Sequence, residues 1–214
     1  MHIFNFYQSD VSLAFARALV ESCSSVGMKK VFLGNSGAEA NEGAVKIARK
    51  YSLLNYGNGR YRIVTLRGSF HGRTITTLAA TGQDHFHKDF GPFTEGFAHI
   101  PAGDIKALDQ ALDGTVCAFM LEPVQGESGI RPQDSGFVKE AAALCRERDV
   151  LLVFDEIQSG IGRTGRFLAC EEYGIPVDIV TLAKGLAGGL PIGAVLAGEK
   201  VCDVMVPGDH GSTF

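Results

Sequence analysis

Lys184 is the residue whose surroundings most clearly suggest chemistry. It lies in the apolar, glycine-rich stretch of residues 180–191 (VTLAKGLAGGLP). An amine between an apolar segment and a flexible glycine turn is expected to be partly desolvated, which favours its neutral form and its attack on a carbonyl carbon. The alternative is an ordinary lysine that extends from a loop into water. Its neighbours favour a lysine that forms a Schiff base.

Asp155 closes the apolar run of residues 150–154 (VLLVF). A carboxylate at the end of a buried strand is costly to desolvate unless a cation lies beside it. A protonated pyridine nitrogen is one such cation, and a carboxylate that keeps the proton there makes the ring an electron sink. The same residue is also suited to bind Mg²⁺ with Glu156 as a second ligand, or to cap a helix. These three interpretations stay open at this point.

Residues 35–42 (NSGAEANE) join an apolar run to a helical pattern. Asn35 or Ser36 is suited to cap the helix, and Glu39 favours the positive end of its dipole. The small Gly37 and Ala38 leave backbone N–H groups free, and such groups bind phosphate. An ordinary cap without a ligand is the more frequent reason for such a segment. Neither of the common glycine-rich nucleotide-binding patterns occurs at a strand–helix junction, which disfavours a nucleotide.

Three further side chains each have two interpretations. Phe70, beside His71, is suited to stack on a heteroaromatic ring or to pack in the core. Arg73 can bind a substrate carboxylate through two hydrogen bonds, or form a surface ion pair. Gln158 lies about one helical turn past Asp155 and is suited to bind a phenolic oxygen, or to remain a solvated loop residue. The histidines and cysteines lack metal-ligand spacing, so no metal site is predicted.

The elements that must position these residues alternate between strands and helices. Strands are expected at residues 31–34, 61–66, 116–121, 150–154 and 179–181, and helices at 11–22, 38–53, 73–81 and 136–148. Such alternation predicts an α/β fold with a mostly parallel sheet covered on both faces. Residues 194–197 are expected to form a strand of different orientation. Each candidate segment directly follows a strand, and ligands bind at the carboxyl ends of such sheets.

Composition excludes several classes of protein. The 214 residues carry a formal net charge of −4 and no basic run, which argues against nucleic acid and anionic membranes as partners. The apolar runs are of strand length, and the first residues lack the pattern of a signal peptide. Five scattered cysteines without a C-x-x-C pair fit a reduced, cytoplasmic compartment.

The motifs taken together resemble those of the class III (ω-amino acid) aminotransferases. The matching strings are NSGAEANE (35–42), FHGRT (70–74), EPVQGE (122–127), DEIQSGIGRTG (155–165), AKGLAGGLPIGA (183–194) and GDHGSTF (208–214). The resemblance implies pyridoxal phosphate as cofactor and the large domain of fold type I, a three-layer α/β/α domain. Residues 100–108 and 207–214 are most similar to the acetylornithine aminotransferases within that class.

The resemblance also implies a role for each matching residue. Lys184 forms the Schiff base and Asp155 holds the pyridine nitrogen. Ser36, Gly37 and Ala38 lie at the phosphate; Phe70, His71, Ile157 and Gln158 lie around the ring; Arg73 and Glu127 serve the substrate, Glu127 through a gating arginine. Thr213 is expected at the phosphate of a neighbouring subunit and Ser212 near its substrate. Shared sites of this kind imply a homodimer.

The implied reaction transfers an amino group from N-acetylornithine to 2-oxoglutarate, a step of arginine biosynthesis. Ornithine, 4-aminobutyrate or succinylornithine as donor are the alternatives, and so is a catalytically incompetent fragment of the fold that acts only in binding or dimerisation. Residues 1–214 are expected to form one incomplete cofactor-binding domain. The N-terminal segment and the C-terminal small domain of the family are expected to lie outside it.

Overall fold

The computed structural model describes residues 9–214, which are built around one seven-stranded sheet. In spatial order its strands are β1 (Met28–Gly34), β9 (Gly193–Gly198), β8 (Ile179–Leu182), β7 (Leu151–Asp155), β4 (Val116–Leu121), β2 (Arg62–Leu66) and β3 (Phe97–Ile100). Of these seven, β9 runs antiparallel to both of its neighbours, and the pairs from β8 to β3 are parallel. The predicted mostly parallel sheet with one strand of different orientation is therefore confirmed.

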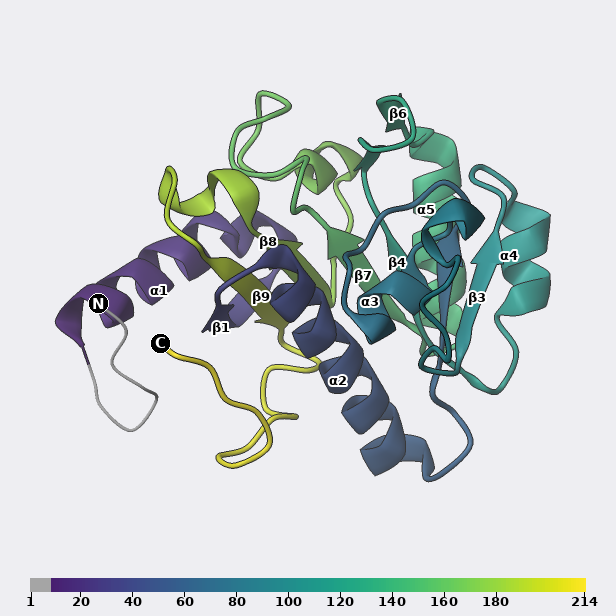
Figure 1. Cartoon of the computed structure of the whole chain (residues 1–214), viewed down its shortest axis with the longest axis horizontal. Helices are drawn as coiled ribbons and strands as arrows, with labels where there is room; N and C mark the ends of the chain where they lie inside the picture. Colours follow the sequence, from purple (N-terminus) through teal and green to yellow (C-terminus); the bar gives the residue numbers. More distant parts are fainter. Residues whose placement is uncertain (1–8) are drawn as a thin grey trace.

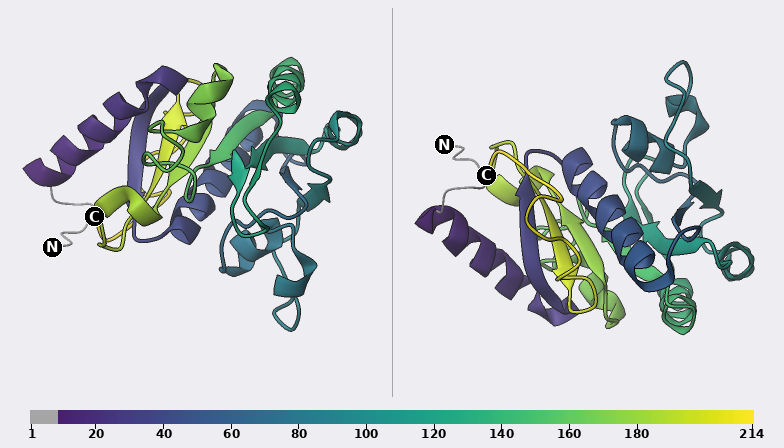
Figure 2. Two further views of the ribbon diagram at one scale, coloured as in Figure 1. Left: turned by 90° about the horizontal axis from the view of Figure 1, so that it is seen from above. Right: turned by 90° about the horizontal axis from the view of Figure 1, so that it is seen from below.

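Helices cover both faces of this sheet, as Figure 2 shows in its two end-on views. On one face lie α1 (Asp10–Ser22), α4 (Ile105–Ala111) and α5 (Ser135–Glu147), whose apolar sides contribute Leu19, Leu108 and Phe137 to the larger core. On the other face lies α2 (Gly37–Tyr56), which contributes Ala44 and Ile47 to the second core. The molecule is thus a three-layer α/β/α domain, as predicted (Figure 1).

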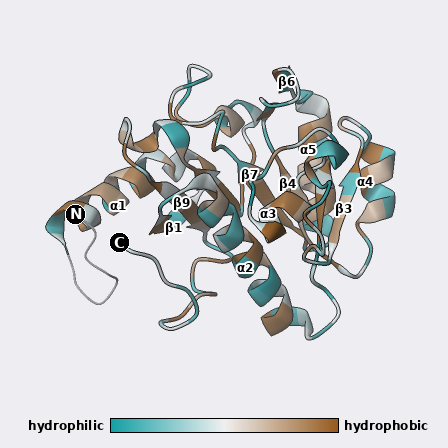
Figure 3. Ribbon diagram, viewed as in Figure 1, coloured by the Kyte–Doolittle hydropathy of each residue, from teal (hydrophilic) through white to brown (hydrophobic). Residues whose placement is uncertain are grey.

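Strand β4 shows why a continuous apolar run forms the middle layer. Its six residues are all buried. Val116, Phe119 and Leu121 pack in the core beneath α4 and α5, whereas Cys117 and Met120 pack in the core beneath α2. Because neighbouring side chains point to opposite faces, a strand covered on both sides needs apolar residues at every position. Figure 3 shows this as mostly brown central strands between helices that alternate brown and teal.

The predicted elements are present, with changes at some ends. The helix expected at 73–81 is shorter, α3 (Ile75–Ala80), because Thr74 caps it in a reciprocal pair of bonds with Thr77. β3 and α4 were not predicted from the sequence, nor was the small antiparallel pair of β5 (Val124–Gln125) and β6 (Arg131–Pro132). Four 3₁₀ turns were also missed: η1 (Ser24–Val26), η2 (Asp84–Phe86), η3 (Ala169–Tyr173) and η4 (Lys184–Ala187).

The sheet directs five loops to one edge. Strands β1, β2, β4, β7 and β8 all run in one direction, so the segments that follow them meet at the carboxyl edge. These are the segments in which the candidate residues lie. Between residues 9 and 214, no helix combines the length and the apolar character needed to cross a membrane.

Candidate active site

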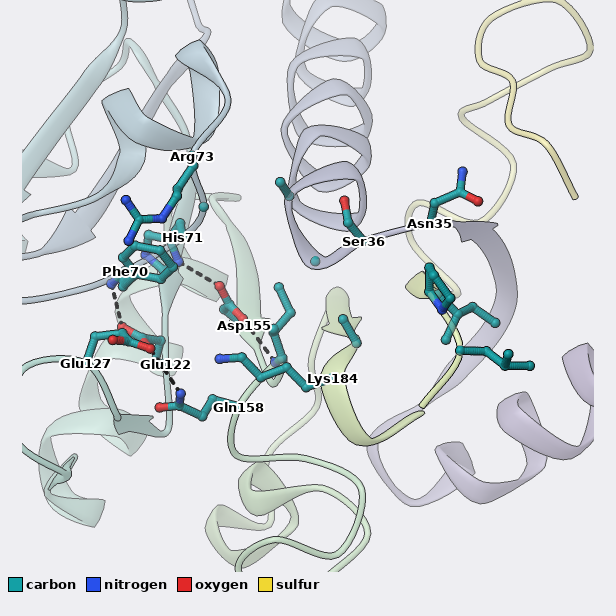
Figure 4. Close-up of a pocket in the computed structure, with 18 residues that line it drawn as sticks. Asn35, Ser36, Phe70, His71, Arg73, Glu122, Glu127, Asp155, Gln158 and Lys184 are labelled. Atoms are coloured by element: carbon teal, nitrogen blue, oxygen red, sulfur yellow. Dashed lines mark hydrogen bonds and ion pairs between the residues drawn. The ribbon is translucent and has the colours of Figure 1, made fainter. Parts of the chain in front are cut away.

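A cavity of about 410 Å³ lies at the carboxyl edge of the sheet. All five predicted segments contribute to it, and its lining comprises Asn35, Ser36, Gly37, Ala38, Phe70, His71, Gly72, Arg73, Glu122, Glu127, Asp155, Ile157, Gln158, Ala183, Lys184, Leu190, Pro191 and Ile192. Figure 4 shows the labelled side chains converging from the loops after separate strands. The five segments that follow the strands therefore meet at one cavity.

The turn between β1 and α2 forms one side of the cavity. Ser36 is the N-cap of α2 and accepts a hydrogen bond from the Glu39 backbone N–H, at 3.2 Å. The backbone N–H of Asn35 donates to the Glu39 carboxylate at 2.9 Å. The first turn of a helix leaves its backbone N–H groups without helical partners. The N–H groups of Gly37 and Ala38 are therefore available to an anion at the positive end of the α2 dipole.

This turn is held by very close packing. A Cβ atom on Gly193 would lie 2.0 Å from the Ser36 carbonyl oxygen, and one on Gly37 would lie 2.9 Å from Cδ1 of Ile157. Glycine is therefore required at Gly193, where the start of β9 meets the backbone of the turn. Ile157 is placed directly against the same turn.

Asp155 ends β7 and lies almost fully buried, with 3% exposure. Its Oδ2 accepts hydrogen bonds from His71 Nδ1 and from Asn41 Nδ2, both at 2.8 Å. Its Oδ1 accepts one from the backbone N–H of Ile157 at 3.0 Å. The carboxylate is therefore held by three donors from three segments. Asn41 was not among the site residues predicted from the sequence.

Glu156, the second ligand that a magnesium site at Asp155 would need, does not line the cavity. It is fully buried and accepts hydrogen bonds from the Ser159 hydroxyl and the backbone N–H of Cys170. Within residues 9–214, the His, Cys, Asp and Glu side chains form no group of three or more that could hold a metal ion. The alternative of a shared metal site at Asp155 and Glu156 therefore has no support in the geometry.

His71 is buried against Asp155. Burial lowers the pKa of its imidazole, but the hydrogen bond to Asp155 and the negative charges of Asp155 and Glu122 outweigh burial, so the net pKa is raised. Among the described residues, its Nε2 has no hydrogen-bond partner although it is buried. Asp155 therefore lies beside a histidine that readily carries positive charge.

Glu122 follows β4 and is a second buried carboxyl group, with 5% exposure. Burial raises its pKa to about 8, with the charge of Asp155 acting in the same direction and those of His71 and Lys184 opposing it. Its Oε2 accepts a hydrogen bond from the backbone N–H of Phe70 at 3.0 Å. Glu122 therefore fixes the backbone on which Phe70 is carried. It was quoted in the motif set but not predicted as a site residue.

The guanidinium group of Arg73 lies over two aromatic rings, those of Phe70 and Phe86. The guanidinium carbon of Arg73 lies 5.5 Å from the ring centre of Phe70 and 5.1 Å from that of Phe86. The two rings meet edge to face at 5.5 Å. Phe86 lies in η2, a short polar turn with no periodic pattern, so the sequence offered only its aromatic type as a signal. The predicted Arg73 thus stands at the cavity, held over two rings.

Lys184 follows β8 and lies in η4. Its backbone has φ of 48°, a left-handed conformation that is uncommon for a residue with a side chain and is often found at functional sites. Its side chain points toward the space between Asp155 and Glu122 (Figure 4). The expected partial desolvation was wrong for this chain, because Lys184 is exposed. The apolar residues around it in the sequence do not cover its side chain.

Gln158 and Glu127 meet at the cavity edge. The amide nitrogen of Gln158 donates to Glu127 Oε1 at 3.2 Å. A Cβ atom on Gly126 would lie 1.2 Å from Gln158 Oε1, so this approach needs glycine there. The second N–H of the Gln158 amide is left for another acceptor. The predicted partners, a phenolic oxygen for Gln158 and an arginine for Glu127, remain predictions.

Two predicted residues do not line the cavity. Thr213 donates its hydroxyl to Asn35 Oδ1 of the same chain at 2.9 Å. The Ser212 hydroxyl oxygen accepts from the backbone N–H of Phe214 at 3.2 Å. The expectation that both act in the site of a neighbouring subunit remains a prediction.

Known proteins are similar to this chain in sequence and in fold. The model of the family described as "Aminotransferase class-III" matches residues 1–214. An acetylornithine aminotransferase of Caldanaerobacter subterraneus is 52% identical over 214 residues, which are 100% of this chain and 53% of that relative. One of Haemophilus ducreyi is 51% identical, over 100% of this chain and 54% of its own length. The crystal structure of the ornithine aminotransferase from Toxoplasma gondii ME49 superposes with a TM-score of 0.92 at 40% identity, covering 100% of this chain and 51% of that one. The chain spans about half the length of the curated relatives it matches.

Proposed function

This chain belongs to the class-III aminotransferase family, and on that basis we propose that residues 1–214 carry the pyridoxal phosphate-binding large domain of an acetylornithine aminotransferase. Enzymes of this class depend on pyridoxal phosphate. The observation that carries the proposal is the meeting of Lys184, Asp155 and the Gly37–Ala38 turn in one cavity at the ends of three strands. An amine, a buried carboxylate and free N–H groups match the aldehyde, ring nitrogen and phosphate of that cofactor.

The residues present fit the cofactor on physical grounds. Asp155 is buried, and within residues 9–214 its ion-pair partner is His71 rather than a lysine or arginine. Its Oδ1 accepts one hydrogen bond and retains a lone pair for a second donor. A ring N–H⁺ would supply both that donor and the positive charge that a buried carboxylate needs. The N–H groups at the start of α2 would receive the phosphate.

Bound pyridoxal phosphate supplies an aldehyde that condenses with amines and a ring that accepts the electrons of a broken bond at Cα. Lys184 would hold the cofactor and then, as a free amine, remove the proton from the substrate Cα and deliver one to the former aldehyde carbon, so that the nitrogen stays with the cofactor when the oxo acid leaves. Asp155 would keep the ring nitrogen protonated. Arg73 would pair with the substrate carboxylate through two hydrogen bonds. Gln158 would donate its remaining N–H to the phenolic oxygen.

We infer N-acetylornithine as amino donor, and hence a step of arginine biosynthesis, from the names of the relatives that are 52% and 51% identical. Ornithine is the second candidate, because the Toxoplasma structure that fits with a TM-score of 0.92 is named an ornithine aminotransferase. 4-Aminobutyrate and succinylornithine remain further donors to test. Initial rates with 2-oxoglutarate and each of these amines would distinguish them.

A homodimer with shared sites and a reducing cytoplasm are parts of the same proposal. Leu190, at the cavity, is 73% exposed, and Phe90 is 60% exposed, as expected of residues that a second subunit covers. All five cysteines are free, and four of them are buried as small apolar side chains. Sedimentation of the purified chain would measure the assembly.

Absorbance tests the central claim. Titration of the chain with pyridoxal phosphate is expected to produce a band near the visible edge that borohydride reduces, and peptide mass analysis is expected to place the label on Lys184. Lys184→Ala should lose the reducible band. A wild-type chain without the band at saturating cofactor would refute the proposal. A band without amino transfer to any donor would support the alternative, a cofactor-binding fragment that does not turn over.

A further inference from the structure

Asn41 is a buried amide beside the cavity to which neither the sequence motifs nor the proposed reaction assigns a role. We propose that Asn41 is a positioning residue that links α2, and with it the Gly37–Ala38 turn, to the carboxylate of Asp155. This link fixes the phosphate-binding turn relative to the carboxylate that would bind the ring nitrogen of the same cofactor. The inference rests on the proposed function, because it concerns the geometry of the same site.

The position of Asn41 in the chain makes this link possible. It lies in the second turn of α2, whose first turn offers its N–H groups to the cavity. Its side chain leaves the helix toward the sheet and is 1% exposed. The amide nitrogen donates to Asp155 Oδ2 at 2.8 Å and to the carbonyl oxygen of His71 at 2.7 Å. One side chain thus joins α2 to the end of β7 and to the loop that follows β2.

The orientation of this amide follows from its partners. A carboxylate oxygen and a backbone carbonyl oxygen can only accept, so the nitrogen of Asn41 must face both of them. Its Oδ1 is buried and has no hydrogen-bond partner among the described residues. The two donated bonds are therefore what the amide contributes at this position, and a residue without an N–H on its side chain cannot replace them.

The consequence for Asp155 is that its rotation is restricted. Oδ2 accepts from Asn41 and from His71, while Oδ1 accepts from the backbone of Ile157. With both oxygens engaged, the plane of the carboxylate is set, and the free lone pair of Oδ1 has a defined direction. Removing Asn41 leaves Oδ2 with one donor. Replacing it by aspartate brings a second carboxylate against Asp155 in a buried place, where like charges repel strongly.

Asn55 offers a matched control on the same helix. Its amide nitrogen also donates to a carbonyl oxygen, that of Tyr51, at 2.8 Å, but the side chain is exposed and far from the cavity lining. Asn55→Asp therefore makes the same chemical change in α2 without reaching Asp155.

The experiment measures the dissociation constant of pyridoxal phosphate by absorbance for wild type, Asn41→Asp, Asn41→Ala and Asn55→Asp. We expect Asn41→Asp to weaken binding by at least about tenfold, Asn41→Ala by a smaller factor, and Asn55→Asp not to change it. The pH midpoint at which the bound chromophore changes colour should also move in the two Asn41 variants. Wild-type affinity and an unmoved midpoint in either folded Asn41 variant would overturn the inference. If Asn41→Asp does not fold, Asn41→Ala decides it.

A double substitution separates positioning from general packing. In an Asp155→Asn background the like-charge repulsion is gone, so Asn41→Asp should cost far less affinity than it does in wild type. A purely structural role predicts equal losses in both backgrounds, together with lower melting temperatures of the cofactor-free protein and an unmoved chromophore midpoint.

One readout does not depend on the cofactor. In the cofactor-free chain, the proton that His71 Nδ1 shares with Asp155 is expected downfield in the proton NMR spectrum, and its position should move in both Asn41 variants but not in Asn55→Asp. Absence of the reducible band in wild type would refute the proposed function alone. An unmoved His71 proton in the Asn41 variants would refute the role of Asn41.

Discussion

The two sides of the cavity are built differently. Asp155, His71 and Glu122, with Asn41 directly behind Asp155, form a buried wall. Each of the four is at most 5% exposed and makes at least one hydrogen bond to a neighbour in the site. Lys184, Arg73, Glu127 and Gln158 form an open rim. Of these, Lys184, Arg73 and Glu127 are exposed. The wall is thus determined by packing within this chain, whereas most of the rim is open to solvent.

This difference separates two kinds of consequence. A change in the wall alters groups that water cannot replace, because a buried polar atom that loses its partner bears the full cost of desolvation. A change in the rim alters groups that water can solvate. We therefore expect wall substitutions to lower stability as well as cofactor binding, and rim substitutions to leave stability nearly unchanged. At Lys184 the rim change would still remove the proposed attachment of the cofactor.

Within the wall, the largest effect is expected from Asp155→Asn, which keeps the shape of the side chain but removes its charge. The rate of amino transfer should fall by on the order of 10²–10³-fold, because the ring nitrogen loses the carboxylate that keeps it protonated. Rapid mixing of the cofactor-loaded protein with amine measures the rate. Asp178→Asn is the control, since Asp178 is another largely buried carboxylate that accepts a backbone N–H, from Leu152 at 2.8 Å, away from the cavity. Equal rates in wild type and Asp155→Asn would remove Asp155 from the proposed chemistry.

The pH dependence of the free energy of unfolding tests the role of Glu122 in the buried wall. Burial raises its pKa to about 8 from an ordinary value of 4.5, so the folded state binds this proton more tightly than the unfolded chain. Its contribution to stability is complete below the unfolded pKa and is lost as the pH rises to about 8. Glu122→Gln, which still accepts from the Phe70 N–H, should therefore lose less stability than wild type between about pH 5 and about pH 9, by roughly 2–4 kcal/mol.

Urea unfolding at the two pH values measures this difference. Glu127→Gln, five residues further along the chain but on the exposed rim, is the matched control and should follow wild type. Parallel losses in wild type and Glu122→Gln would show that Glu122 keeps an ordinary pKa. His71, whose pKa is also raised, acts in the same direction in wild type and Glu127→Gln; in Glu122→Gln its pKa is raised less, because the charge of Glu122 is gone.

Two glycines extend the comparison to the backbone. A Cβ atom at Gly193 would meet the carbonyl of Ser36, which is backbone, whereas one at Gly126 would meet the end of the flexible Gln158 side chain. Gly193→Ala should lower the free energy of unfolding by about 1–3 kcal/mol and weaken cofactor binding. Gly126→Ala should displace Gln158 from Glu127 and change stability by less than about 1 kcal/mol. Denaturant midpoints that rank these variants in the opposite order would contradict the division into wall and rim.

An element of this fold could be predicted from the sequence where neighbouring residues alone form a recognisable pattern. The strands at 116–121 and 150–154 were predicted because a run buried on both faces must be apolar throughout. Their parallel pairing then brought the polar segments after them to one edge. β3 and α4 are short, with four and seven residues. β3 lies at the sheet edge and only Ile100 in it is buried, and α4 has one buried residue, Leu108. Too few residues lie in β3 or α4 for a periodic pattern of apolar side chains to be recognised in the sequence.

The unpredicted parts of the site depend on contacts between distant residues. Asn41 and Asp155 are 114 positions apart, so no spacing rule connects them. Glu122 and Phe70 are 52 apart. Lys184 shows the converse, since apolar neighbours in the sequence predicted burial and the folded chain leaves the side chain exposed. Residue types at strand ends thus indicate which groups form a site, while burial and hydrogen bonding depend on the tertiary structure.

The smallest effect is expected from a change at Phe86. This residue lies outside the matching motifs, and its ring supports Arg73 of the rim. A cation over an aromatic ring at an exposed site gains about 0.5–1 kcal/mol, and Arg73 lies 5.1 Å from the ring centre of Phe86. Phe86→Ala should therefore raise the dissociation constant of 2-oxoglutarate by roughly two- to fivefold, because the guanidinium loses orientation but not charge. Calorimetry on the cofactor-loaded protein measures it, with Phe90→Ala, a 60% exposed phenylalanine of the same loop, as the control. If Phe86→Ala binds 2-oxoglutarate as wild type does, the ring of Phe70 alone supports Arg73. If Phe86→Ala instead binds the cofactor more weakly, Phe86 acts with the residues of the buried wall.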